Sequence, residues 1–153
     1  MHVQAWRETY TGQVPDTVLS ELDAAGRAAA WREAVGRGTQ VQLAVLDGEI
    51  VGFGASRPQP DPSLPFAGEI SAIYVLRRAQ GAGVGRMLMA AMARDLLARG
   101  LRSVSLWVLE TNAGAQRFYH VLGGREVTRR EQEREGFGAV GVAYGWDDLT
   151  VLL

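Results

Sequence analysis

The feature that most constrains this chain is a glycine-rich turn at residues 80–86, with the sequence QGAGVGR. The alternating run at residues 69–75 predicts a strand before it, and the apolar stretch at 87–97 predicts a helix after it. Glycines at every second position leave no Cβ in the way, so the backbone N–H groups can point at one spot. The first N–H groups of a helix lack internal partners, and the helix dipole adds partial positive charge there. The turn is therefore expected to attract a phosphate group.

Two common phosphate-binding patterns do not match this turn. The P-loop pattern ends in Gly-Lys-Ser/Thr, whereas Arg86 follows Gly85 here. The dinucleotide fingerprint GxGxxG also fails, because its last glycine would fall on Arg86 when counted from Gly81 and on Leu88 when counted from Gly83. The interpretations that remain are a different phosphate-binding loop and a tight strand-to-helix turn with no ligand.

Composition excludes several classes of function. At 153 residues the chain is expected to form a single domain, residues 1–153. A formal net charge of −1 provides no general basic field for nucleic acid or an anionic membrane. The absence of cysteine excludes disulfides, thiolate metal sites and an acyl-cysteine intermediate, and two widely separated histidines make us expect no metal site. Neither a signal peptide nor a spanning segment is evident, so we expect a cytoplasmic enzyme or binding module.

The order of predicted elements indicates an α+β fold with a mixed, mostly antiparallel sheet flanked by helices. Helices are expected at 3–10, from Pro15 and at 27–35, the last with Trp31 and Val35 facing inward. A hairpin follows, with strands at 40–46 and 50–56. After the glycine turn and its helix come a strand at 101–109 and a helix at 113–122. A final hairpin has the charged run 129–136 as its tip and a second strand with one face of small residues.

Two motifs, in this order, resemble those of the GNAT superfamily of N-acetyltransferases, which use acetyl-coenzyme A. The first is Gln80-x-x-Gly83-x-Gly85, preceded by Ile-Tyr-Val at 73–75. The second is residues 110–123, an Asn-capped helix with a tyrosine near its end. The chain departs from the family in lacking a strand before the first helix, and in having two arginines where a proline is common after the strand.

The resemblance implies that acetyl-coenzyme A is the co-substrate. Its pyrophosphate is expected on the N–H groups of the glycine turn, and its pantetheine arm is expected to pair with the end of the strand at 69–75. Val75 N–H is the implied donor to the thioester carbonyl. The cofactor-binding residues implied are Ile73, Tyr74, Val75, Arg77, Gln80, Gly81, Ala82, Gly83, Val84, Gly85, Arg86, Asn112, Ala115 and Phe118.

The same resemblance nominates a catalytic base and a catalytic acid. Glu69 is the candidate base and Glu110 its alternative, although Glu69 could simply begin its strand in solvent. Tyr119 is the candidate acid for the leaving thiolate, and its alternative role is core packing. Asn112 is expected to cap its helix, to contact pantetheine, or to do both.

We therefore expect an acetyl-CoA-dependent N-acetyltransferase acting by direct attack within a ternary complex. The acceptor would be a primary amine of a small molecule, peptide or protein, bound between the first helices and the final hairpin. Four aromatic residues could line that pocket or fill the core: Trp6, Tyr10, Trp31 and Tyr144. The alternatives are a non-catalytic CoA-binding sensor or interaction domain, and a dimerisation module that uses Tyr144 and Trp146.

No nucleic acid or membrane partner is expected, but a homodimer is possible. Without a preceding strand, the strand at 40–46 would leave one sheet edge unpaired, and its alternating Val41, Leu43 and Val45 include no charge that would block pairing. We expect this edge to be covered by N-terminal residues folding back or, preferably, by a second copy of the chain.

Overall fold

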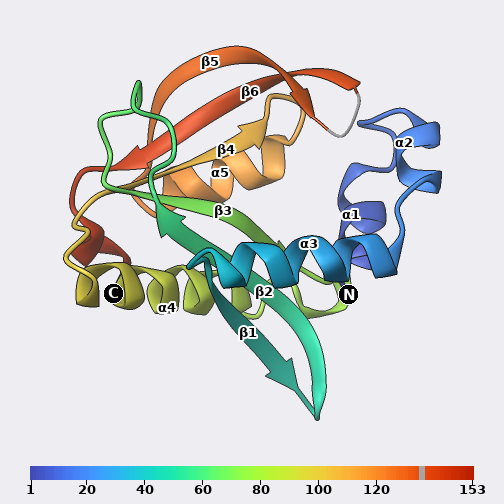
Figure 1. Ribbon diagram of the computed structural model, residues 1–153, viewed down its shortest axis with the longest axis horizontal. Coiled ribbons are helices and arrows are strands. Elements are labelled where there is room, and N and C mark those ends of the chain that lie inside the picture. The colour runs from blue at the N-terminus through green and yellow to red at the C-terminus, as the bar shows by residue number, and fades with distance from the viewer. Residues whose placement is uncertain (135–136) are drawn as a thin grey trace.

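The computed structural model describes residues 1–134 and 137–153 as helices packed on one six-stranded sheet (Figure 1). The helices are α1 (His2–Tyr10), α2 (Asp16–Ser20), α3 (Ala24–Gly36), α4 (Val84–Ala98) and α5 (Ala113–Val121), with short 3-10 helices at Arg77–Ala79 and Leu149–Leu152. The strands are β1 (Gln40–Leu46), β2 (Glu49–Pro58), β3 (Gly68–Val75), β4 (Val104–Leu109), β5 (Arg125–Arg134) and β6 (Phe137–Trp146).

The sheet has the strand order β1-β2-β3-β4-β6-β5. β3 and β4 pair in parallel, and the other neighbouring strands described are antiparallel. The prediction of a mixed, mostly antiparallel α+β fold is confirmed. The three N-terminal helices precede β1, so among the described residues no strand comes before the first helix.

Helix α4 supplies much of the main core. Leu88, Met89, Met92 and Leu96 are buried on its sheet-facing side, as the two apolar rows predict. Glycine in β2 permits the close approach, because a Cβ on Gly54 would lie 2.6 Å from the Met92 methyl carbon. The helix that begins at the glycine turn is therefore held firmly against the sheet.

A second, smaller core joins the N-terminal helices to the sheet. Trp6 and Tyr10 of α1 pack with Val14, Leu19 and Leu109. Helix α3 has no fully buried residue, and the prediction that Val35 faces inward is wrong, because 52% of Val35 is exposed. Trp31 is partly buried, and its ring lies 5.3 Å from that of Phe53.

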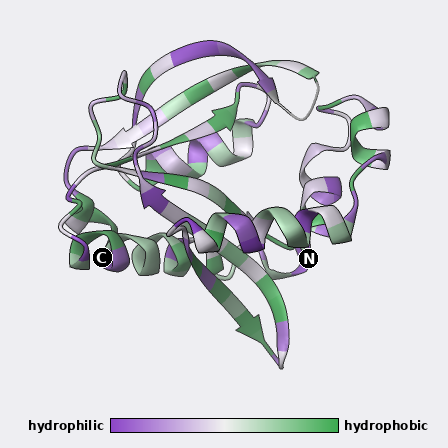
Figure 2. Cartoon of the chain, in the orientation of Figure 1, coloured by the Kyte–Doolittle hydropathy of each residue, from purple (hydrophilic) through white to green (hydrophobic). Residues whose placement is uncertain are grey.

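The β1–β2 hairpin projects from the body of the protein, and Figure 2 shows hydrophobic residues along it. Its turn has Asp47 and Gly48 at φ of 51° and 79°, as expected for an Asp-Gly hairpin. Leu43 and Val45 of the edge strand are exposed. Residues 2–10 form α1 and do not fold back onto this edge, so in the described structure β1 pairs with β2 alone.

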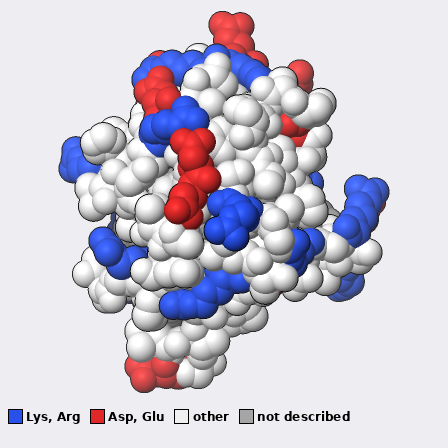
Figure 3. Space-filling model, turned by 90° about the vertical axis from the view of Figure 1, so that its left-hand side faces the viewer, with Lys and Arg blue, Asp and Glu red and all other residues white. Residues whose placement is uncertain are grey.

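The final hairpin differs from its prediction in two ways. Most of the charged run expected as its tip lies within β5, which continues to Arg134, and the connecting residues 135–136 lie outside the described part. The small face of β6 receives aromatic rings of this protein, since a Cβ on Gly145 would lie 2.2 Å from Phe66. In Figure 3 acidic and basic residues alternate in the upper centre of the face, and the charged residues below are mostly basic and separated by uncharged ones.

Tyr144 and Trp146 of β6 are buried in the main core. They are 7% and 2% exposed, so they offer little surface to a partner. This argues against the dimerisation module that the sequence left open.

Candidate functional site

The main cleft opens where β3 and β4 separate. The parallel pairing covers only Gly68↔Val104, Glu69↔Ser105 and Ile70↔Leu106. On its other side β3 contains a bulge, because consecutive residues of β2 pair with Ile70 and Ala72 and leave Ser71 as the extra residue. A bulge bends its strand, so β3 diverges from β4 here and leaves a cavity of about 600 Å³, a size typical of ligand sites.

The cleft brings together all the predicted cofactor-binding residues except Ala82. Residues of β3, the glycine turn and α5, far apart in sequence, line one cavity. Ala82 belongs to the turn but is not a lining residue.

The glycines of the turn are required for different reasons. Gly81 and Gly83 have φ of +75° and +84°, a conformation that residues with a Cβ rarely adopt. Gly85 lies in the first turn of α4, where a Cβ would be 3.0 Å from the Phe118 ring. The turn thus places the start of α4 at the cleft and lets α5 approach closely.

Polar contacts hold the end of β3 against the turn. Gln80 Nε2 donates to the Val75 carbonyl oxygen at 3.0 Å, a structural role that the sequence did not suggest. Leu76 N donates to Val51 O of β2. Because backbone groups alternate in direction along a strand, the N–H of Val75 faces away from β2, toward the cleft side.

The three arginines near the turn differ in their surroundings. Arg77 is bound to α1, since its backbone N donates to Glu8 Oε2 at 2.6 Å and its Nη2 to Glu8 O at 2.8 Å. The hydrogen bond from Arg77 N, helped by one from Gln4, lowers the pKa of Glu8. Arg78 forms an ion pair with Glu49. Arg86 lines the cleft and has no ion-pair partner among the described residues.

Tyr119 and Asn112 of α5 both line the cleft. Tyr119 is 6% exposed, and its ring lies 6.0 Å from Tyr144 and 6.1 Å from Trp146, so it is a packed residue at the cavity wall. Asn112 Oδ1 accepts from Ala115 N and caps the helix, as predicted. Their positions in the cleft are compatible with the further roles expected of them, proton donation to the thiolate by Tyr119 and contact with pantetheine by Asn112.

The two candidate bases have different environments. The Glu69 side chain is 12% exposed, and Arg57 Nε donates to its Oε2 at 2.7 Å, so Glu69 does not begin its strand in solvent. Glu69 is not a lining residue of the cleft but lies two residues before the bulge at Ser71.

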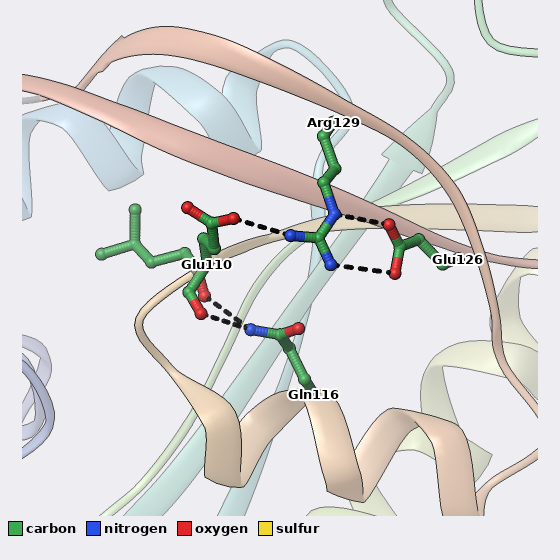
Figure 4. A network of polar contacts seen from close by, with 5 residues as sticks. Glu110, Gln116, Glu126 and Arg129 are labelled. Carbon is green, nitrogen blue, oxygen red and sulfur yellow. Dashed lines mark hydrogen bonds and ion pairs between the residues drawn. The ribbon is translucent and has the colours of Figure 1, made fainter.

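Glu110 lies in a network at the end of β4 (Figure 4). Its carboxylate accepts from Arg129 Nη1 at 2.6 Å, and Arg129 also binds Glu126. These carboxylates, Glu126 foremost, raise the pKa of Arg129. Gln116 Nε2 donates to the backbone oxygens of Leu109 and Glu110. Glu110 is 47% exposed, so its contacts are those of a surface network that fastens α5 to β4.

A second pocket reaches the bulge from the side of α1 and α3. Its volume is about 450 Å³, and it shares Ser71, Ala72 and Tyr74 with the main cleft. Trp6 and Trp31 line this second pocket, whereas Tyr10 lines the main cleft. Two cavities thus meet at one stretch of β3, an arrangement suited to bringing two substrates together.

A splayed strand pair beside a glycine turn at a helix start is the arrangement of an acyl-coenzyme A-dependent transferase. The chain belongs to the acetyltransferase (GNAT) family, whose model matches residues 3–123.

Proteins similar in sequence are named as acetyltransferases, which is consistent with this family. The chain is 32% identical over 152 residues to the uncharacterized N-acetyltransferase YuaI of Bacillus subtilis (strain 168), covering 99% of this chain and 87% of that protein. It is 41% identical over 81 residues to a mycothiol acetyltransferase of Thermomonospora curvata, a match covering 53% of this chain but only 26% of the relative.

Solved structures share the fold. A putative GNAT-family acetyltransferase from Desulfovibrio desulfuricans superposes with a TM-score of 0.68 at 18% identity, covering 97% of this chain and 91% of that chain. A putative acetyltransferase from Salmonella typhimurium, solved with acetyl-CoA, gives a TM-score of 0.64 at 19% identity, covering 84% and 75%.

Among residues 1–134 and 137–153, none of the helices has the length and apolar character needed to cross a membrane. The same residues contain no cluster of three or more acidic or histidine side chains able to hold a metal ion.

Three residues of the site were not predicted from the sequence: Glu8, Arg57 and Ser71. Glu8 and Arg57 are distant in sequence from the residues they bind, Arg77 and Glu69. Ser71 is set apart only by the strand register. Opposite charges near the facing ends of two neighbouring strands are the sequence signal that could have suggested the Arg57–Glu69 pair.

Proposed function

We propose that the protein transfers an acetyl group from acetyl-CoA to a primary amine by direct attack in a ternary complex. The observation that carries this proposal is the meeting of two cavities at Ser71, Ala72 and Tyr74. The main cleft has the glycine turn and α5 in its walls and would hold acetyl-CoA. The second pocket would hold the amine.

The cofactor contacts follow from the main cleft. The pyrophosphate would bind the N-terminal N–H groups of α4, with charge added by Arg86, which is not otherwise paired among the described residues. Arg77 is engaged with Glu8, so its contribution would be mainly to the shape of the turn. The pantetheine arm would pair with the end of β3, where Val75 N–H would donate to the thioester carbonyl.

The transfer itself needs one base and one acid. The neutral amine nitrogen attacks the thioester carbon and forms the C–N bond. The C–S bond then breaks, and the sulfur leaves with the electron pair and takes the proton of the Tyr119 hydroxyl. The surplus proton of the amine passes through water to Glu69, and solvent reprotonates Tyr119. The products are an amide and free coenzyme A.

Glu69 is preferred over Glu110 as the base because of its position. Each carboxylate is paired with an arginine, but Glu69 is more buried and lies two residues from Ser71, which lines both cavities, whereas Glu110 lies in an exposed network. Positioning two substrates in adjoining cavities supplies much of the rate in such a mechanism, since it replaces a collision in solution.

The decisive experiment measures acetyl-CoA binding by calorimetry and free thiol release with a panel of amines. We expect saturable binding, and thiol release only when certain amines are present. Binding without thiol release for every amine would favour the CoA-binding sensor. Absence of binding by the folded protein would contradict the assignment of the cleft.

A further inference from the structure

The residues that line the second pocket indicate the chemical class of the acceptor. It is lined by aromatic rings of α1, α3 and β3, and by the guanidinium groups of Arg27 and Arg57. Glu133 of β5 is the acidic residue among those that line it. We infer that the acceptor is an amino acid with an aromatic or large apolar side chain, whose carboxylate binds Arg57. This inference rests on the proposed function and specifies its substrate class.

Arg57 is arranged to bind a carboxylate. Its Nε donates to Glu69 Oε2, while its two terminal amino groups have no hydrogen-bond partner among the described residues. The side chain is 43% exposed, at a wall of the pocket. A guanidinium presents its N–H groups in a planar fork that matches a carboxylate, so the unengaged side of Arg57 fits an anionic group.

The surroundings of Trp6 favour a ligand with hydrogen-bond acceptors. The guanidinium carbon of Arg27 lies 5.4 Å from the centre of the Trp6 ring and already occupies one aromatic face. The buried indole N–H of Trp6 has no acceptor among the described residues. A ligand with carboxylate oxygens would supply an acceptor for this N–H.

The register of the sheet sets the distance between carboxylate and amine. Arg57 pairs with Glu69 across β2 and β3, and the bulge at Ser71 follows two residues later. A carboxylate on Arg57 would thus lie near the stretch of β3 that lines both cavities. An amino group one or a few bonds from that carboxylate would lie beside this shared stretch, and its proton would pass through water to Glu69. A long, cationic polyamine would instead place a second charge beside the arginines.

The aromatic wall accounts for the side chain of the acceptor. Trp31 donates from Nε1 to His2 Nδ1 at 3.0 Å, and the His2 ring lies 5.3 Å from that of Tyr74. These linked rings form a fixed apolar surface beside Ala72. Such a surface favours a planar or bulky apolar group through burial and stacking.

The test compares matched amines under saturating acetyl-CoA, with thiol release as the readout. The panel contains phenylalanine, phenylalaninamide, phenethylamine, glycine and spermidine. We expect kcat/KM for phenylalanine to exceed that for phenethylamine by about 10- to 100-fold, the range expected for charge-assisted hydrogen bonds to one carboxylate. Glycine should be slower than phenylalanine, because it lacks the side chain that the rings would contact.

Variants separate recognition of the carboxylate from other effects. Arg57→Gln also removes the ion-pair partner of Glu69, so kcat/KM should fall with both amines, and the loss with phenethylamine measures that effect. The loss with phenylalanine should exceed it by roughly 10-fold or more, because only phenylalanine has a carboxylate to bind. Arg57→Lys keeps the charge but lacks the planar fork, so its loss with phenylalanine should be intermediate. If Arg57→Gln does not fold, Arg57→Lys provides the test of carboxylate binding. Arg125→Gln, which removes an exposed ion pair with Asp147 away from both cavities, is the matched control and should leave both substrates unchanged.

The outcomes distinguish this inference from the function on which it rests. Turnover of phenethylamine or spermidine equal to that of phenylalanine, or equal losses for both in Arg57→Gln, would overturn the inference and leave the acetyltransferase in place. If acetyl-CoA bound but none of the amines caused thiol release, both the inference and the proposed function would be overturned.

Discussion

The side-chain amide of Gln80 donates a hydrogen bond to the carbonyl oxygen of Val75 at 3.0 Å. This bond ties the glycine turn to the end of β3, so the proposed phosphate site and pantetheine site are held in fixed relation. This hydrogen bond can support acetyl-CoA binding even if neither side chain contacts the cofactor.

Gln80→Ala should therefore weaken acetyl-CoA binding without unfolding the protein. Loss of one hydrogen bond of about 1 kcal/mol predicts a dissociation constant roughly 5-fold higher, measured by calorimetry. Gln13→Ala is the matched control, because Gln13 makes a similar side-chain bond to Thr9 O away from the turn. Equal affinities in the Gln80 and Gln13 variants would show that the tie does not organise the site.

Replacing Gly83 and Gly85 with valine should abolish acetyl-CoA binding in a folded protein. Valine at 83 costs roughly 1–2 kcal/mol in the left-handed conformation, and valine at 85 must displace Phe118. Both changes also add methyl groups where the phosphate would approach. Gly138→Val is the control, since a Cβ there meets no atom within 4 Å. A folded double variant with unchanged affinity would remove the phosphate-loop assignment.

Tyr119→Phe tests the proposed acid. Removal of the hydroxyl should lower kcat by roughly 10- to 1,000-fold while acetyl-CoA affinity stays near that of the unmodified protein, because only proton donation is lost. Tyr144→Phe removes a hydroxyl from a neighbouring buried ring that does not line the main cleft, and it should retain turnover. Equal turnover in the two variants would return Tyr119 to a packing role.

Ionised Asp61 should stabilise the folded protein, and this contribution should be lost at acidic pH. Hydrogen bonds from Ser63 and then Arg130 lower the pKa of Asp61 from 3.8 to about 2. Because the folded-state pKa is depressed, this stabilisation is fully present above the usual value and is lost as pH falls from about 4 through about 2.

The measurement compares denaturant unfolding of Asp61→Asn with that of the unmodified protein. Asp61→Asn should be less stable at pH 7, and the difference should shrink toward pH 2. Asp47→Asn is a control in an exposed turn where asparagine tolerates the positive φ. A stability difference for Asp61→Asn that persists undiminished at pH 2 would contradict the proposed linkage.

The edge of β1 is proposed to pair with a second copy of the chain. An uncharged strand with exposed Leu43 and Val45 can extend the sheet by strand pairing. Sedimentation should show a dimer, and amide exchange should be slow across Gln40–Leu46. Val45→Lys should give a monomer, whereas Val151→Lys, at an equally exposed position, should not. A monomeric unmodified protein with rapidly exchanging β1 amides would show that the edge remains bare.

Much of the fold could be predicted from the sequence because its determinants are local. Apolar spacing defines α4, the Asp-Gly turn defines the β1–β2 hairpin, and Asn112 marks the start of α5. The glycine turn requires residues without a Cβ wherever they occur in the chain. The predicted cofactor-binding residues therefore line one cavity, with Ala82 as the exception.

The tertiary structure alone decided how these parts meet. The bulge at Ser71 exists only in the register of β3 against β2, and Ser71 lines both cavities. Arg57 reaches Glu69, and Glu8 reaches Arg77, only when distant segments pack together. Val35 looks apolar enough to be buried, yet no residue of α3 is fully buried and Val35 is 52% exposed. Contacts between distant segments depend on strand register and helix packing, which local residue patterns do not specify.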